Sequence, residues 1–166
     1  MIDNNALNKI SYGVYILSSF KDGKINAMII NSAMQVTAEP AAVAVSVNKE
    51  SLTYEYILSS GVFALMPMAE KTDMPFIGRF GFRTGRNFDK FADVKFEKGI
   101  LGAPLVLEKT TAAIEAKVTG LLDAGGHVIF MGEVKAAKTI CEDACMTYDY
   151  YHRVIKGKMP KGATHV

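Results

Sequence analysis

Three stretches of the sequence combine residue types that bind ligands. The first covers residues 26–36, where an apolar strand-like run ends in small and amide side chains. Such a surface suits a flat heteroaromatic ring, because the apolar side chains face the ring while Asn31, Ser32 and Gln35 offer donors at its edge. An ordinary strand followed by a loop with satisfied amides has the same pattern, and the residues alone leave both interpretations open.

The second stretch, Asn48-Lys49-Glu50-Ser51-Leu52-Thr53, places two hydroxyl side chains where a strand ends and a helix is expected to begin. The first turn of a helix offers free N–H groups and the positive end of the helix dipole, which suit a phosphate group. Ser51 is equally explained as an ordinary helix N-cap that needs no ligand.

The third stretch, residues 77–91, interleaves three Gly, three Arg and one Lys with four Phe. Arginine guanidinium groups hold phosphate or stack on flat rings. The glycine spacing matches neither a dinucleotide-binding fingerprint nor a P-loop. Single-stranded nucleic acid binding and a solvated loop anchored by Phe are the alternatives. A fourth candidate is His127 after Gly125-Gly126, which is a hydrogen-bond donor to a ring, an acid or a structural residue.

The elements that must position these residues are mostly strands. Asp22-Gly23 is a hairpin turn signal, Ser51 and Gly61 bound a short helix, and residues 70–90 are expected to be part helix and part loop. A second hairpin turns at 123–126. The predicted strands cover residues 12–20, 25–32, 41–47, 62–66, 113–119 and 127–137.

The strand at 113–119 alternates between apolar and polar residues, which is typical of a half-buried antiparallel strand. Its apolar members Ile114, Ala116 and Val118 are expected to face the core. Its polar members Glu115, Lys117 and Thr119 are expected to face solvent. Many strands with tight Gly turns and few helices predict a mainly β barrel or sandwich.

Composition narrows the class of protein. A chain of 166 residues fits one domain. A net charge of +2 with both signs mixed does not favour nucleic acid as a partner. Cys141 and Cys145 do not complete a structural zinc site, and we expect them to be reduced thiols. The sequence shows no signal peptide and no run long enough for a membrane helix, so we expect a cytoplasmic protein without membrane contact.

Taken in order, these stretches resemble the flavin reductase-like, FMN-binding split-barrel family over about residues 5–155. The resemblance is strongest to the flavin domain of high-molecular-weight rubredoxins. It rests on the motifs at 12–17, 26–40, 45–53, 77–91, 122–134 and 148–161. Two positions depart from the family pattern: Ala27 stands where Gly is frequent, and Gly126 stands where Asp is frequent, which bears on how His127 is oriented. No Cys-x-x-Cys pair follows the last motif, so no iron site is assigned.

The resemblance implies a mainly β, antiparallel Greek-key split β-barrel with a few short helices, formed by residues 1–155 and followed by a basic tail or linker at 156–166. It also implies a homodimer with FMN near the interface. The implied ring-lining residues are Met28, Ile29, Ile30, Asn31, Ser32, Gln35 and Val36, with His127 near the ring. The implied ribityl phosphate ligands are Asn48, Lys49, Ser51 and Thr53. Phe80, Gly81 and Arg86 would lie on the phosphate or nicotinamide side.

The implied function is an oxidoreductase that transfers a hydride from NADH or NADPH to FMN and passes electrons to a rubredoxin-like or other redox protein. Arg79, Arg83 and Arg86 are the expected nicotinamide phosphate contacts. The first alternative is an FMN-binding electron carrier with little NAD(P)H activity. The second is a flavin-free interaction domain that has kept the barrel.

Overall fold

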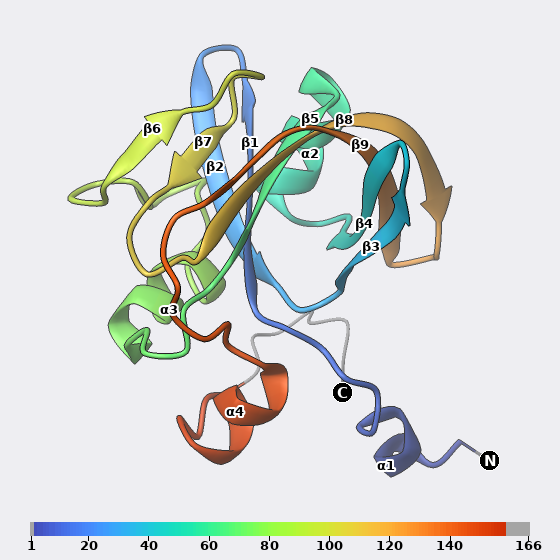
Figure 1. Ribbon diagram of the computed structural model, residues 1–166, viewed down its shortest axis with the longest axis vertical. Helices are drawn as coiled ribbons and strands as arrows, with labels where there is room; N and C mark the ends of the chain where they lie inside the picture. The colour runs from blue at the N-terminus through green and yellow to red at the C-terminus, as the bar shows by residue number, and fades with distance from the viewer. Residues whose placement is uncertain (1, 159–166) are drawn as a thin grey trace.

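Seven strands form one antiparallel sheet in the computed structural model, which describes residues 2–158 (Figure 1). The strand order is β2-β1-β5-β8-β9-β4-β3, and β6 and β7 form a separate two-stranded sheet. The strands are β1 Tyr15–Lys21, β2 Lys24–Ile30, β3 Ala33–Ala38, β4 Ala41–Asn48, β5 Val62–Pro67, β6 Phe96–Lys98, β7 Pro104–Val106, β8 Ala112–Asp123 and β9 His127–Thr139. The helices are α1 Asn4–Leu7, α2 Leu52–Ser60, α3 Met74–Gly81 and α4 Tyr148–Arg153. The expected mainly β fold is confirmed.

The hairpin of β1 and β2 forms as its turn residues predict. Asp22 and Gly23 have φ angles of 50° and 76°, and Lys21 pairs with Lys24. Two consecutive residues with positive φ give the primed turn whose twist matches that of the flanking strands. This turn fixes the register that brings Ala27 of β2 opposite Ser18 of β1.

Strand β1 is buried on both faces, because the sheet curls and separates two apolar cores. Ile16 and Leu17 are neighbours in the strand with no exposed surface, and they belong to different clusters. The Ile16 cluster includes Phe80 of α3, whereas the Leu17 cluster includes Ile57 of α2. Helices α2 and α3 therefore pack into different cores. Ala27 of β2 belongs to the core with α3, and Ile30 of β2 belongs to the core with α2.

Helix α2 begins and ends where the sequence predicts. The Ser51 hydroxyl accepts the Tyr54 N–H at 3.2 Å, and Gly61 ends the helix with a φ of 67°. The segment at 70–90 contains helix α3, capped by the Asp73 side chain, and the loop that follows it. Both predictions are confirmed.

Several elements have no clear signal in the sequence. The sequence predicts a loop where β3 lies, but this segment pairs with β4 along the edge of the sheet. Five of its six residues are exposed and its register shifts between Gln35 and Thr37, so no in-and-out alternation marks it as a strand. The short strands β6 and β7 and the helix α4 also lack a sequence signal that predicts them.

The expectation that Glu115 faces solvent is wrong. Glu115 is only 4% exposed, because a register shift between Glu115 and Ala116 interrupts the alternation of β8. Its carboxylate accepts the N–H groups of Ile100 and Leu101 at 3.1 and 2.8 Å. The buried acid thus holds the loop between β6 and β7.

Replacing Glu115 with Ala is expected to destabilise the protein by about 2 kcal/mol, because two backbone N–H groups lose a charged acceptor. Lys117→Ala on the same strand is the matched control, since Lys117 is exposed. Denaturant unfolding of the two variants measures the difference. Equal midpoints would contradict the role of the buried carboxylate.

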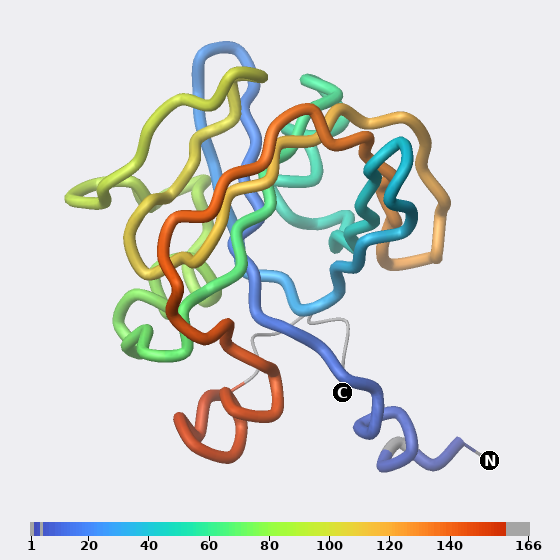
Figure 2. Tube along the Cα trace, in the orientation of Figure 1, coloured from blue at the N-terminus to red at the C-terminus, as the bar shows by residue number. Residues whose placement is uncertain are grey.

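A segment near the N-terminus (blue in Figure 2) pairs with the segment that leads into α4 (red). Thr147 pairs with Gly13, and the Tyr148 N–H donates to the Tyr12 carbonyl at 2.8 Å. This pairing anchors α4. Of the predicted basic tail at 156–166, residues 157–158 still bond to Tyr151, and residues 159–166 lie outside the described residues. Within residues 2–158, no helix is both long and apolar enough to cross a membrane.

Candidate functional site

A cavity of about 300 Å³ lies where the free edge of β2, the start of α2 and the loop after α3 meet. The end of β4, the start of β9 and Tyr148 of α4 complete its wall. Its size is at the lower end of the range for small-molecule and cofactor sites. Four of the sequence motifs with ligand-binding chemistry therefore converge on one place.

Ten of the predicted site residues line this cavity: Met28, Ile29, Ile30, Asn31, Asn48, Ser51, Thr53, Phe80, Gly81 and His127. Five do not: Ser32, Gln35, Val36, Lys49 and Arg86. Arg83, an expected nicotinamide phosphate contact, also lines the cavity. The remaining lining residues were given no role from the sequence: Asn26, Ser46, Glu50, Leu52, Thr84, Gly85, Lys90 and Tyr148.

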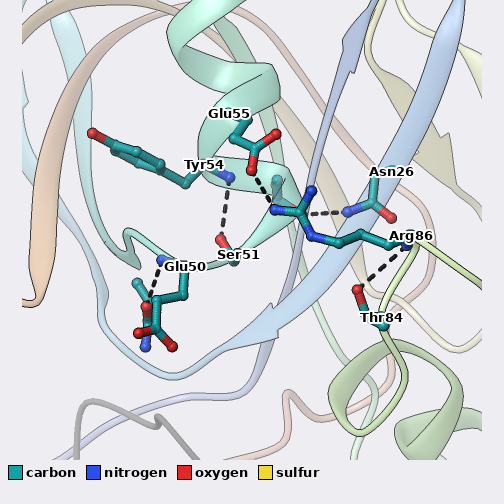
Figure 3. A network of polar contacts seen from close by, with 9 residues as sticks. Asn26, Glu50, Ser51, Tyr54, Glu55, Thr84 and Arg86 are labelled. Carbon is teal, nitrogen blue, oxygen red and sulfur yellow. Dashed lines mark hydrogen bonds and ion pairs between the residues drawn. The ribbon is translucent and has the colours of Figure 1, made fainter.

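The phosphate end of the predicted site is built on the first turn of α2 (Figure 3). Ser51 caps the helix, and the fully buried Thr53 accepts a hydrogen bond from Asn26 Nδ2 at 2.9 Å. The first N–H groups of a helix have no acceptor within the helix, and its dipole makes that end positive. Asn26 therefore fixes the helix start against the edge strand, with an anion-binding end directed at the cavity.

Two of the predicted cationic ligands have other partners. The Lys49 ammonium group lies 2.7 Å from the Asp123 carboxylate, and this bond lowers the pKa of Asp123. Arg86 forms an ion pair with Glu55 on the exposed side of α2 (Figure 3). Neither residue lines the cavity, and their ion pairs link the elements around it.

The three arginines of the 77–91 stretch fall into two groups, because Arg79 and Arg83 share the Phe88 ring whereas Arg86 pairs with Glu55. Arg79 and Arg83 lie over the Phe88 ring at 5.8 and 5.3 Å from its centre, and Arg79 also donates to the Ala92 carbonyl. Of the three, only Arg83 lines the cavity. Arg86 is thus apart from Arg79 and Arg83, and their contact with the nicotinamide phosphate stays a prediction.

The other end of the cavity is apolar with polar groups at its rim. Met28, Ile29 and Ile30 come from β2, and Tyr148 adds an aromatic wall. The Tyr148 hydroxyl hydrogen-bonds to the side chain of Asn31, and burial raises its pKa above the ordinary value. The side chains of β2 and Tyr148 make this end mainly apolar, and its contact with a ring stays a prediction.

His127 lies at the start of β9, opposite Asn48 of β4. Burial lowers the pKa of His127 below its ordinary value, so the imidazole is neutral near pH 7. Of the predicted ring contacts outside the cavity, Gln35 and Val36 lie on the exposed strand β3, and Ser32 donates to Asn31. Ser32 thus contacts the cavity-lining Asn31 without lining the cavity itself.

Lys90 is the cavity residue that is least expected from the sequence. It is 4% exposed, and its ammonium group donates to the backbone carbonyls of Ala27 at 2.8 Å and Phe80 at 3.0 Å. Burial lowers its pKa to about 8. From the sequence alone, a lysine in a polar stretch is expected to be exposed to solvent. Its burial follows from the packing of α3 against β2, which brings the two carbonyl acceptors together.

These features define a mainly β protein with a small-molecule-sized cavity at the edge of an antiparallel sheet. The flavin reductase like domain family matches residues 7–157, and the chain belongs to this family. It is 41% identical to a ferric-chelate reductase (NAD(P)H) of Archaeoglobus fulgidus over 98% of the chain and 96% of that protein. It is 38% identical to a high molecular weight rubredoxin of Moorella thermoacetica, over 98% of the chain and 71% of that protein.

Solved structures agree with this assignment. The flavin reductase PheA2 superposes with a TM-score of 0.74 at 27% identity, covering 89% of this chain and 93% of that one. A flavoredoxin from Methanosarcina acetivorans superposes with a TM-score of 0.71 at 26% identity, covering 83% and 74%. The expected split-barrel fold and the membership in the flavin reductase group of oxidoreductases are both confirmed.

Proposed function

We propose that the protein is an FMN-dependent oxidoreductase that takes a hydride from NADH or NADPH and passes the electrons to a redox partner. The observation that carries this proposal is the convergence of an apolar strand edge and a helix N-terminus on one cavity, in a chain of the flavin reductase like domain family. The relative from Archaeoglobus fulgidus, named for NAD(P)H, supports the nicotinamide donor.

The residues present fit FMN. The apolar side chains of β2 and the ring of Tyr148 suit the flat isoalloxazine, and the first turn of α2 suits the phosphate. The buried pair of Asn26 and Thr53 fixes these two parts relative to each other. When FMN is bound, the chemistry it supplies is acceptance of a hydride and onward transfer of two electrons.

The side chains of this protein orient the cofactor and control its surroundings. Met28 and Ile29 keep water from one face of the cavity, while Asn31 and His127 offer polar groups at its rim. Because the hydride moves between two cofactors, no residue needs to act as a catalytic acid. A neutral His127 adds a hydrogen-bonding group to this rim without adding a charge.

An anaerobic visible spectrum of the protein with added FMN, recorded before and after NADH or NADPH, tests the function. Rapid bleaching of bound flavin, well above the rate of free FMN without protein, supports the proposal. Bound flavin that stays oxidised favours the electron-carrier alternative. The similarity to a high molecular weight rubredoxin and to a flavoredoxin supports this alternative. A protein that binds no flavin would contradict both.

We further propose that the protein is a homodimer, with the outer face of β3, β4, β8 and β9 as the interface. Met34 and Leu122 on this face are 65% and 64% exposed. Met34 is in register with Ala44 and Met131, and Leu122 with Ile129, which continues the apolar surface across the four strands. An apolar sheet face of this kind favours association with a second copy.

The double variant Met34→Glu with Leu122→Glu is expected to be monomeric, because each copy would bring buried charges into the interface. Light scattering during gel filtration measures the mass. Leu58→Glu is the matched control, since Leu58 is 49% exposed on α2, outside this face. A wild-type protein that elutes as a monomer would refute the dimer.

A further inference from the structure

The two cysteines of the chain lie in one loop, which joins β9 to α4. Both are free thiols, and Cys145 is exposed whereas Cys141 is partly buried. The Cys145 Sγ lies 3.2 Å from Thr111 Oγ1, and the Cys141 Sγ lies 3.5 Å from the Thr110 carbonyl oxygen. Because Thr110 and Thr111 are adjacent in the chain, the two thiols are neighbours in space.

The loop between the cysteines is held against the sheet, which keeps its two ends together. The Cys141 N–H donates to the Thr111 carbonyl at 3.3 Å, and the Ala144 carbonyl accepts the Glu70 N–H at 2.8 Å. Only three residues separate the cysteines, so a disulfide between them closes within this loop. The same loop leads into α4, so a cross-link here lies three residues from Tyr148 of the cavity wall.

The surroundings of Cys141 provide an acceptor for its thiol proton. The Cys141 Sγ lies 3.4 Å from Asp143 Oδ2, and an ion pair with Lys71 at 2.6 Å holds the Asp143 carboxylate in place. Cys145 is exposed and open to small reagents. An accessible cysteine beside a second one is typical of redox-sensing pairs, in which the accessible thiol is oxidised first and the second one resolves it.

We propose that Cys141 and Cys145 form a reversible disulfide on reaction with hydrogen peroxide. The Cys145 sulfur attacks the peroxide, the O–O bond breaks, and Cys145 becomes a sulfenic acid with release of a water molecule. The Cys141 sulfur then attacks Cys145 and gives its proton to Asp143, and the S–O bond breaks to release a second water molecule. The pair of thiols thereby loses two electrons, which reduce the peroxide to water. This inference does not depend on the proposed function.

Mass spectrometry of tryptic peptides tests the proposal. Both cysteines fall in the single peptide 139–153, since no Lys or Arg lies between Lys138 and Arg153. The folded protein is treated with hydrogen peroxide, and the remaining thiols are then alkylated under denaturing conditions. We expect this peptide to lose two hydrogen atoms and to take up no alkyl group, and dithiothreitol to restore both thiols. Oxidation of Met146 in the same peptide would instead add oxygen, and Met146 is only 1% exposed in the folded protein.

Two single variants test the order of the steps. Cys141→Ser is expected to lose its remaining thiol about as fast as wild type and to stop at a sulfenic acid that dimedone traps. Cys145→Ser is expected to react about 10-fold more slowly, because Cys141 is partly buried and hydrogen-bonded. The reverse order of rates would overturn the assignment of Cys145 as the first thiol to react. A wild-type peptide that keeps both thiols, or disulfides that only link two copies of the chain, would overturn the proposal itself.

Discussion

Gly132→Ala is expected to destabilise the protein by about 2–3 kcal/mol through overpacking of the core. A Cβ atom at Gly132 would lie 2.6 Å from the Phe63 ring and 2.8 Å from the Cβ of Ala116. Both neighbours are fully buried in the core that α2 covers, so neither side chain has room to move away. Strand β9 needs a residue without a side chain here, because the ring of Phe63 occupies the space.

Gly120→Ala is the matched control for this prediction. Gly120 lies on β8, the partner strand of β9, and a Cβ atom added there would have no other atom within 4 Å. Alanine is there expected to be neutral or to stabilise by up to about 1 kcal/mol, because glycine loses more backbone entropy on folding. Thermal or denaturant unfolding should give opposite signs for the two variants. A loss of stability of the same size in both would refute the packing argument.

The sequence predicts those parts of the fold that depend on neighbouring residues. The Asp22-Gly23 turn and the Ser51 cap act over two to four residues, and both elements form where expected. Strand β3 is not predicted, because most of its side chains are exposed and show no apolar alternation. It forms through backbone pairing with β4, which the sequence does not reveal. The inward turn of Glu115 depends on a bulge in the pairing of β8 with β9.

In the candidate site, too, the residues placed by local structure are predictable from the sequence, whereas those placed by long-range contacts are not. The helix start at Ser51 and the apolar run at Met28 are visible in the sequence and do line the cavity. The charged residues beside these motifs are less predictable, because Lys49 pairs with Asp123 from 74 residues away. Lys90 becomes a cavity residue only when α3 packs against β2. Sequence reasoning found the motifs and missed the tertiary partners.

Gly85→Ala is expected to lower FMN affinity about 10-fold or more and to destabilise the protein by about 1–3 kcal/mol. A Cβ atom at Gly85 would lie 2.0 Å from Asn26 Oδ1 and 3.2 Å from Leu52. Asn26 is 3% exposed and bonded to Thr53, so it has no free rotation to avoid the clash. Either the Asn26–Thr53 bond breaks or the loop moves outward, and both changes disturb the region proposed to bind phosphate.

Gly78→Ala on α3 is the control for the same segment of the chain. The nearest atom to its Cβ would be the Phe82 ring at 3.9 Å, an ordinary contact. Alanine is preferred over glycine inside a helix by about 1 kcal/mol, so this variant is expected to be at least as stable as wild type, with FMN affinity within twofold. Fluorescence titration with FMN compares the two variants. If Gly85→Ala binds FMN as tightly as Gly78→Ala, the loop after α3 does not form part of the phosphate site, and the cavity has to bind FMN from its β2 and α2 walls alone.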